Sequence, residues 1–321
     1  MIKAEITDSE LNEHLNKIHK DELSMFVMAD RQFRGAFFNA TRLVNKMRAQ
    51  HNLGILETMI LGQALICAGL LIPLMKGREH LTFRYDTNGP AAGFSVEADS
   101  SGYVRGFLFQ NHIPVFKPLE NWNLEPFLGE GTLTITRMGE GMKAPQVGTV
   151  EIMYKNIAED LAWYFLQSEQ IHTAFNTSVQ FDSSGRVTGA GGMFIQYIPG
   201  DGGRSKVSGN SVEKEEVTGK DELISKVENA FRAMPSIGKW FSDGGDMDDV
   251  VYGLFREFSP SIMLSRDIIF DCPCSKDYYV NHIKHLSRTE LDDIIENDPE
   301  PIEIVCHNCA SRYEIYKKDL V

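Results

Sequence analysis

Two closely spaced pairs of cysteines near the C-terminus constrain this chain more than any other feature. Cys272 and Cys274 form a CxC motif, and Cys306 and Cys309 form a CxxC motif after 31 intervening residues. Four thiolates that can meet at one point suit a tetrahedral site, which zinc prefers, and such a site has no open position for a substrate. The same sulfurs could instead act as two dithiols that become disulfides once the metal leaves. We expect one Zn²⁺ per chain, bound by all four cysteines.

The spacing leaves two interpretations open, a structural zinc ribbon and a site that also senses oxidants. A CxxC pair is usual at zinc sites, whereas a CxC pair is less common. Pro273 fixes its own φ and favours an extended Cys272, which helps preset the geometry of the shorter pair. His307 lies inside the CxxC loop, where we expect a solvated side chain and no metal ligand.

The charge of the chain argues against a nucleic-acid partner. The formal net charge is −13, and residues 271–321 contain eleven acidic against six basic side chains. A zinc module that binds nucleic acid should be basic, because phosphate contacts supply most of its affinity. The acidic zinc region therefore argues against that class.

The cysteine count and the N-terminal sequence indicate a cytoplasmic protein. The first residues, MIKAEITDSELNEH, are polar and acidic, unlike a secretory signal. Four of the five cysteines have metal spacing, which fits a reducing compartment better than a disulfide framework. The fifth, Cys67, lies in an apolar run, and we expect it to be a buried thiol that binds no metal.

That apolar run, residues 58–75, just reaches the length of a membrane span. Gln63 and Pro73 interrupt it, together with two glycines, and the rest of the chain contains no second span. We therefore expect a buried central helix and no membrane partner.

The N-terminal two-thirds of the chain is predicted to be α+β, with antiparallel sheets and packed helices. Leu81, Phe83 and Tyr85 alternate with polar residues, as in a half-buried strand. Short Gly-containing turns separate the strand-like segments, which favours antiparallel pairing over a doubly wound nucleotide fold. The predicted helices are 8–19, 38–54, 55–76 and 157–168. The further predicted strands are 92–98, 103–110, 131–138, 146–153, 174–182 and 187–198.

The glycines at 189, 191 and 192 resemble part of a dinucleotide-binding loop. They lie within a strand pattern, and no helix begins after them, so the motif lacks its structural context. We interpret them as packing glycines.

Residues 199–211 form the clearest boundary in the chain, because they are rich in Gly and Ser and read as a flexible linker. We predict three parts: an α+β core at 1–199, a flexible and helical linker at 200–262, and a small zinc-binding domain at 263–321.

Two amphipathic helices are predicted within the linker, separated by Pro235 and Gly244-Gly245. The apolar stripe of the first is Leu223, Ile224, Val227, Phe231 and Met234. The apolar stripe of the second is Met247, Val250, Val251, Leu254, Phe255 and Phe258. Burying one such stripe does little more than offset the entropy of ordering its backbone, so these helices need another surface to pack on. If that surface included the zinc domain, loss of the metal would release them.

Several short motifs, in order and at characteristic spacing, resemble the heat-shock protein 33 family of redox-regulated holdase chaperones. They run through nearly the whole chain: Thr41-Arg42-Leu43-Val44, Asn88-Gly89-Pro90, Gly102-Tyr103-Val104-Arg105-Gly106, Gly131-Thr132-Leu133-Thr134-Ile135, Glu159-Asp160-Leu161-Ala162, Tyr164-Phe165, Ser168-Glu169-Gln170-Ile171, Ala190-Gly191-Gly192 and Cys272-Pro273-Cys274-Ser275.

The resemblance implies an ATP-independent chaperone that is inactive when reduced and zinc-bound. Oxidation would pair Cys272 with Cys274 and Cys306 with Cys309, expel zinc, and unfold the C-terminal domain and the linker. The active form would bind unfolded or partly unfolded client proteins and dimerise. We expect the released stripe of Leu223, Ile224, Val227, Phe231 and Met234, and the surface it had covered, to contact clients.

Two other classes of function compete with a holdase, which is not an enzyme. A zinc hydrolase is excluded by four thiolate ligands, and a thiol-disulfide oxidoreductase would more typically place CxxC near a βαβ unit. The remaining alternatives are a zinc-stabilised thiol-disulfide oxidoreductase and a zinc-stabilised interaction adaptor.

Overall fold

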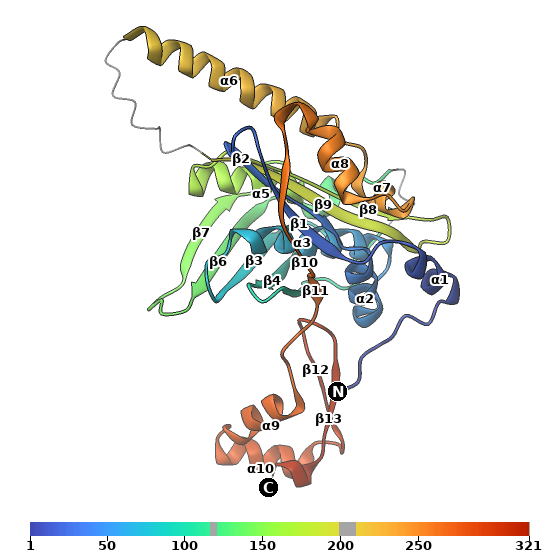
Figure 1. Cartoon of the computed structure of the whole chain (residues 1–321). Coiled ribbons are helices and arrows are strands. Elements are labelled where there is room, and N and C mark those ends of the chain that lie inside the picture. The colour runs from blue at the N-terminus through green and yellow to red at the C-terminus, as the bar shows by residue number, and fades with distance from the viewer. Residues whose placement is uncertain (116–120, 199–209, 321) are drawn as a thin grey trace.

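The computed structural model describes residues 1–115, 121–198 and 210–320. Two large sheets form the body of the protein, and a small lobe at the C-terminal end carries a third, two-stranded sheet (Figure 1). All strand pairs are antiparallel except one short pair that connects the body to the lobe. The α+β architecture with antiparallel sheets is confirmed.

The first sheet has five strands in the order β10-β1-β2-β9-β8. Its strands are β1 (Glu22–Met28), β2 (Phe33–Asn39), β8 (Thr173–Phe181), β9 (Val187–Tyr197) and β10 (Ser261–Arg266). Strand β10 comes from beyond the predicted linker and pairs with β1, with a register shift between Met25 and Phe26. One edge of this sheet is therefore formed by β10, which lies more than 220 residues after its partner β1 in the sequence.

The second sheet has six strands in the order β11-β5-β4-β3-β6-β7. Its strands are β3 (Glu79–Thr87), β4 (Gly93–Asp99), β5 (Tyr103–Leu108), β6 (Gly131–Gly139), β7 (Gln146–Glu151) and β11 (Ile269–Phe270). The side chains of Leu81, Phe83 and Tyr85 are fully buried, as their alternation predicts. The two-residue strand β11 pairs in parallel with β5 at Tyr103 and Val104.

Helix α3 (Ile55–Leu71) lies between the two large sheets and contacts strands of both. All of its residues are buried except Ile55 and Gln63. Among the described residues, one helical stretch, Ile55–Leu74, is long and apolar enough to cross a membrane, and 89% of its most apolar window is buried inside the protein. The predicted buried central helix is confirmed.

The remaining elements of the body pack around this centre. They are α1 (Ser9–Lys17), α2 (Thr41–His51), the 3₁₀ turn η1 (Ile72–Leu74), α4 (Glu125–Leu128), α5 (Ile157–Tyr164) and the π-helix η2 (Phe165–Glu169). Helix α2 contacts β9 and α3, and α5 contacts β8 and α3. These helices cover the inner face of the first sheet.

Three further helices cover the opposite, outer face of the first sheet (Figure 1). They are α6 (Asn210–Arg232), α7 (Ile237–Ser242) and α8 (Met247–Leu254), followed by the 3₁₀ turn η3 (Arg256–Phe258). We call residues 221–258 the helical layer. The residues they cover, which we call the outer face, are Phe26, Met28, Phe33, Phe37, Met193, Ile195 and Tyr197.

Both faces of the first sheet are thus apolar and covered. Antiparallel sheets commonly leave one face in water, with polar side chains at alternate positions. Here Phe37 of β2 packs under the helical layer while Phe38 packs into the core around α3. The sheet therefore depends on two separate coverings.

Glycines of β9 allow the helical layer to lie directly on the sheet. A Cβ at Gly189 would stand 1.9 Å from the Gly238 carbonyl oxygen of α7, and one at Gly191 would stand 2.5 Å from the Phe241 ring. A Cβ at Gly192 would meet Ile66 of α3 on the other face. The prediction of packing glycines is confirmed, and α7 itself is a helix that the sequence did not predict.

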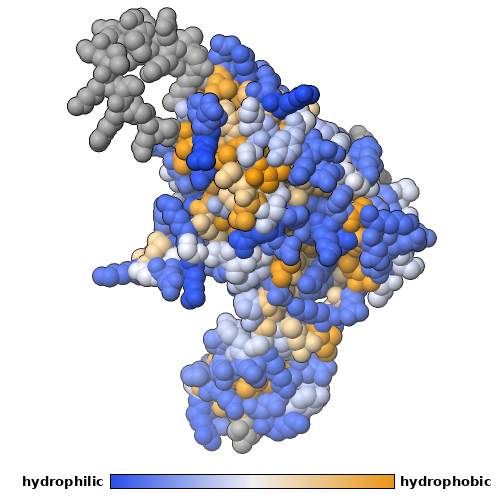
Figure 2. Space-filling view, viewed as in Figure 1, coloured by the Kyte–Doolittle hydropathy of each residue, from blue (hydrophilic) through white to orange (hydrophobic). Residues whose placement is uncertain are grey.

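The cysteine lobe, residues 271–320, contains α9 (Lys276–Lys284), α10 (Arg288–Asn297), β12 (Ile302–Val305), β13 (Arg312–Ile315) and the 3₁₀ turn η4 (Lys317–Asp319). Neither α9 nor α10 has a buried residue. Figure 2 shows that the visible face of the lobe is mainly hydrophilic. The buried apolar interior of the lobe is small and includes Tyr313, Ile315 and Leu320 beside the cysteines.

The structure corrects the predicted helix 38–54. Strand β2 ends at Asn39, and the helix that follows, α2, starts at Thr41. Strands β1 and β2 were missed because both faces of β2 are buried, so its sequence shows no alternation of apolar and polar residues.

The predicted domain boundaries stay a prediction, and residues 262 and 263 both lie within β10. Most of the predicted linker at 199–211 lies outside the described residues.

Candidate metal centre

The four paired cysteines come together in one cluster. Their sulfur atoms all lie within 4.8 Å of one another. The Cys272 and Cys306 sulfurs are 3.8 Å apart, and the Cys274 and Cys309 sulfurs are 3.5 Å apart. These two short distances join one cysteine of each motif to one of the other. The predicted ligand set is therefore assembled across the 31-residue gap.

The CxxC motif forms the tight turn that joins β12 to β13. The Cys306 amide donates to the Ser311 carbonyl at 2.9 Å, and the Ala310 amide donates to the Cys306 carbonyl at 2.7 Å. Ala310 has a φ of 52°, a left-handed conformation that closes the turn. The CxC motif directly follows β11, so β5 of the body fixes the position of its first cysteine.

The sulfur positions fit a tetrahedral thiolate site. Zinc–sulfur bonds of about 2.3 Å place the sulfurs of a regular tetrahedron about 3.8 Å apart, close to the two short distances. Cys272, Cys306 and Cys309 are buried, and Cys274 is partly buried. The cluster can therefore hold a metal ion, with four protein ligands and no open position.

Hydrogen bonds within the cluster move the pKa values of its thiols in opposite directions. Hydrogen bonds from Cys272 and Cys309 hold the pKa of the Cys306 thiol far below its usual range. Hydrogen bonds to Cys272 and Cys306 raise the pKa of Cys309, and burial raises that of Cys274 to about 11. One sulfur thus ionises at the expense of its neighbours, because four like charges at this separation repel one another. A divalent cation removes that conflict.

Two tyrosines line the cluster. The Tyr313 hydroxyl lies 3.0 Å from the Cys274 sulfur and donates to the Cys274 carbonyl at 2.9 Å. The Tyr279 ring lies 5.1 Å from the Tyr313 ring, and burial raises the pKa of both phenols. The hydroxyls therefore stay protonated and can donate hydrogen bonds to thiolates.

Arg105 of β5 reaches the cluster from the body. Its Nη1 donates to the Cys272 sulfur at 3.1 Å, and its Nε and Nη2 lie 2.5 Å from the Glu97 carboxylate. Burial disfavours the charge on Arg105, but Glu97 and Cys272 outweigh burial and raise the pKa of its guanidinium. The cation is therefore permanent. Sequence analysis missed this residue, although it lies in one of the family-like motifs.

The residues after Arg105 also contact the cysteine lobe. The Gly106 amide donates to the Asn308 carbonyl at 3.0 Å, and the rings of Phe107 and His307 lie 5.6 Å apart. His307 is not part of the cysteine cluster, as predicted. Its side chain is exposed, as expected, although one side of the ring contacts Phe107 of the body.

Cys67 is buried and the apolar stripe of α6 is wholly or partly buried, as expected. Cys67 is fully buried in α3, and burial raises the pKa of its thiol. In α6, Val227 and Phe231 are buried against the outer face, with Leu223, Ile224 and Met234 partly buried beside them. The surface that carries the helices is the first sheet, which the sequence did not identify.

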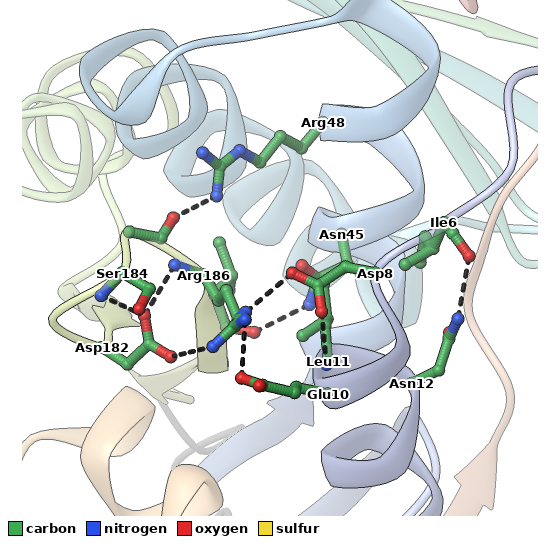
Figure 3. Close-up of polar contacts among 12 residues, drawn as sticks. Ile6, Asp8, Glu10, Leu11, Asn12, Asn45, Arg48, Asp182, Ser184 and Arg186 are labelled. Atoms are coloured by element: carbon green, nitrogen blue, oxygen red, sulfur yellow. Dashed lines mark hydrogen bonds and ion pairs between the residues drawn. The ribbon is translucent and has the colours of Figure 1, made fainter.

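A polar hollow of about 410 Å³ lies between α1, α2 and the β8–β9 turn. Figure 3 shows that its charged side chains bind one another: Arg186 contacts Asp8 and Glu10 at 2.7 Å and Asp182 at 3.5 Å. These contacts attach α1 to the body, and we assign the hollow no chemistry.

Comparisons with known proteins agree on one family. A family model described as Hsp33 protein matches residues 21–316. A "33 kDa chaperonin" of Bacillus cereus (strain B4264) is 26% identical over 304 residues, covering 94% of this chain and 97% of the relative. One from Desulforamulus reducens is 28% identical over 303 residues, covering 94% and 96%. The crystal structure of the 33 kDa chaperonin (Heat shock protein 33 homolog) from Thermotoga maritima has a TM-score of 0.78 and 29% identity, covering 94% of this chain and 97% of that one.

Proposed function

The chain belongs to the Hsp33 family, and from that premise we propose that it is a redox-regulated, ATP-independent holdase. The reduced, zinc-bound form is inactive, and oxidation of the four cysteines releases apolar surface that binds unfolding proteins. The observation that carries the proposal is the pairing of a closed four-sulfur cluster with a helical layer that covers an apolar sheet face.

The chemistry of the switch needs an oxidant such as hydrogen peroxide. A thiolate attacks one peroxide oxygen, and water leaves after protonation, which gives a sulfenic acid. A second thiolate displaces the hydroxyl as another water and forms the disulfide. Each disulfide thus consumes one peroxide and two protons and releases two waters. We assign the disulfides to Cys272–Cys274 and Cys306–Cys309.

The energetics favour release of the lobe when its sulfurs pair. Disulfide formation removes all four thiolate ligands from the metal. A structural zinc contributes roughly 10–16 kcal/mol in small peptide domains, and the lobe's helices bury no residue that could replace it. The reduced lobe therefore depends on the metal for its fold.

Two surfaces are available to bind clients. One is the stripe of α6, Leu223, Ile224, Val227, Phe231 and Met234, and the other is the outer face that it covers. Large apolar surfaces, once exposed, mark interaction sites. The helical layer thus both masks the site and contributes to it.

The alternative of a thiol-disulfide oxidoreductase is less well supported. Its attacking cysteine must be accessible to a protein substrate, yet Cys306 and Cys309 are 5% and 1% exposed. A plain interaction adaptor would leave the covered outer face without a role. We propose a cytoplasmic protein that is not an enzyme and that dimerises on activation.

The decisive experiment compares reduced and peroxide-treated protein in suppressing the aggregation of a heat-unfolding client, followed by light scattering. We expect suppression only after oxidation, with release of one zinc per chain. Equal activity of the two forms, or full zinc retention in an active oxidised form, would refute the proposal.

Substitutions separate the ligands from the remaining cysteine. Cys309→Ser should lose tight zinc binding, whereas Cys67→Ser should keep it and remain switchable. Zinc loss in the Cys67 variant would show that the ligand assignment is wrong.

A further inference from the structure

Arg105 is held by its strand partner in the only orientation that serves two acceptors. Arg105 of β5 lies directly opposite Glu97 of β4 in the sheet register. The guanidinium bonds the Glu97 carboxylate through Nε and Nη2 and turns Nη1 to Cys272. Both side chains of the ion pair are less than a fifth exposed, so solvent screens it little. The body of the protein thus presents one oriented cation to the cluster.

The cluster needs such a cation. Four thiolates around a divalent ion leave a net charge of −2, and a buried charge is costly unless hydrogen-bond donors compensate it. Residues that hydrogen-bond to metal ligands without binding the metal themselves typically contribute roughly 10- to 100-fold to metal affinity. Among the described residues, Arg105 is the charged side chain that donates a hydrogen bond to a sulfur of the cluster. The 3.1 Å contact of its Nη1 with the Cys272 sulfur holds that ligand against the body of the protein.

Cys272 is also the ligand nearest along the chain to the two large sheets of the body. Two residues before it, β11 pairs with β5, and the Ile269 amide donates to the Gly102 carbonyl at 3.0 Å. Strand β10 precedes β11 and is fixed to the body by β1 and by Arg266, which donates to the Ser100 carbonyl at 3.1 Å.

The helical layer begins immediately before β10. Phe258 is buried against the outer face, and its carbonyl accepts the Ala29 amide at 2.7 Å. A continuous segment of paired backbone therefore leads from Cys272 to the layer.

We propose that Arg105 is a positioning residue that couples the place of Cys272 in the four-sulfur cluster to the attachment of β11, β10 and the helical layer. While Cys272 stays in the cluster, the guanidinium anchors the start of the lobe to β5. When Cys272 leaves the cluster as part of a disulfide, that contact is lost and β11 is the first pairing to open. This inference rests on the proposed function, since it specifies how the metal centre regulates the layer.

The test uses the full chain, reduced and loaded with zinc, with no oxidant. Arg105→Gln should transfer zinc to a colorimetric chelator roughly 10- to 100-fold faster, in proportion to the affinity lost. Hydrogen exchange of the Ile269 and Gly106 amides should rise in the same variant. Arg105→Lys should fall between, because one ammonium cannot bond both acceptors in the geometry of a guanidinium.

Arg84→Gln is the matched control. Arg84 lies on the same sheet and forms an ion pair with Asp86 at 2.7 Å, but half of its side chain is exposed. We expect wild-type zinc transfer and exchange from this variant. Identical zinc transfer by Arg105→Gln and Arg84→Gln, or unchanged exchange at Ile269, would overturn the proposal.

A double-mutant cycle separates positioning from general stabilisation. In a Cys272→Ser background, Arg105→Gln should add little to the exchange of Ile269, because its sulfur partner is already gone. An undiminished effect would assign Arg105 a role unrelated to Cys272 and overturn the coupling. If peroxide failed to activate the wild type, the proposed function would fail, whereas the difference between the two arginine variants would still be measurable.

Discussion

The central core and the cysteine lobe are held together by different means. In the core, α3 is buried along nearly its whole length between two sheets, and that burial alone supplies a large favourable free energy. In the lobe, α9 and α10 have no buried residue, and the order of the chain depends on four sulfurs and on contacts with β5. Under the proposed function, the core cannot be switched without unfolding the protein, whereas the lobe would be switched by chemistry at a single cluster.

The helical layer lies between these extremes. Some of its apolar side chains, such as Val227 and Phe255, are fully buried, whereas others, such as Met247, are only partly buried. All of them cover the first sheet from outside. The layer can therefore leave while the core stays folded, provided that its attachment at β10 is weakened.

The largest effect should come from removing the metal from the reduced protein. The lobe should lose its ordered structure, because the metal's contribution of roughly 10–16 kcal/mol is comparable to the whole stability of a domain. Hydrogen exchange should show α9, α10 and β12 unprotected, with α3 unchanged. Equal protection of α9 with and without metal would abolish the contrast between core and lobe.

A buried charge should detach the helical layer. Val227→Asp places a carboxylate in a fully buried position of α6, at a cost of about 3–5 kcal/mol if the charge stays unpaired. We expect client binding without oxidant, weaker client retention, and new protease cleavage confined to residues 221–258. Ser225→Asp, on the exposed side of the same helix, should behave like the wild type.

If Val227→Asp still required peroxide for activity and retained clients as well as the wild type, the apolar stripe of α6 would contribute to packing but not to client binding. Polar substitution of Phe231 should repeat the result of Val227→Asp, because both side chains contact the same sheet face.

Adjacent glycines of β9 allow the two coverings of one sheet to be perturbed separately. Gly191→Ala pushes against Phe241 of the layer and the Phe38 carbonyl of β2, and Gly192→Ala pushes against Ile66 of the core and the Asn176 carbonyl of β8. Overpacking of this kind typically costs about 1–3 kcal/mol. Both variants should lower the midpoint of global unfolding, because each presses on the sheet backbone, but only the first should increase binding of a hydrophobic dye below that midpoint. The same response from both variants would mean that core and layer unfold as one unit.

The smallest effect should come from Cys67→Ala. The side chain lies inside α3, so losing its sulfur should cost about 1 kcal/mol through the small cavity left behind. Zinc stoichiometry and the response to peroxide should stay as in the wild type. A loss of zinc in this variant would connect the core directly to the lobe and contradict their separation.

The parts of the fold that could be predicted from sequence are those with a regular spacing of apolar residues or with a recognisable motif. Strand β3 was predicted from Leu81, Phe83 and Tyr85, because its other face is polar. The cysteine cluster was predicted from spacing, because few other arrangements require two close pairs. Helix α6 was predicted from its apolar stripe.

The missed parts depend on contacts between distant segments. Strand β2 is apolar on both faces, and β10 becomes a strand only by pairing with β1. Arg105 gains its role from the register that places it opposite Glu97 and beside Cys272. Because no local sequence pattern encodes such a register, the sequence alone predicts neither the sheet face under the helical layer nor the contact of Arg105 with the cysteine lobe.

The late position of β10 in the chain has a consequence for biosynthesis. A ribosome that has completed β9 must add 64 more residues to reach Ser261, the start of β10. At about 5–20 residues per second this takes roughly 3–13 seconds. During that interval the nascent chain has made four of the five strands of its first sheet, but neither the open edge of β1 nor the outer face has its partner. If oxidation exposes the same surfaces, as proposed above, every newborn molecule passes through a state that resembles that active form. Translation speed over residues 198–260 should then influence how much of the protein is lost to aggregation.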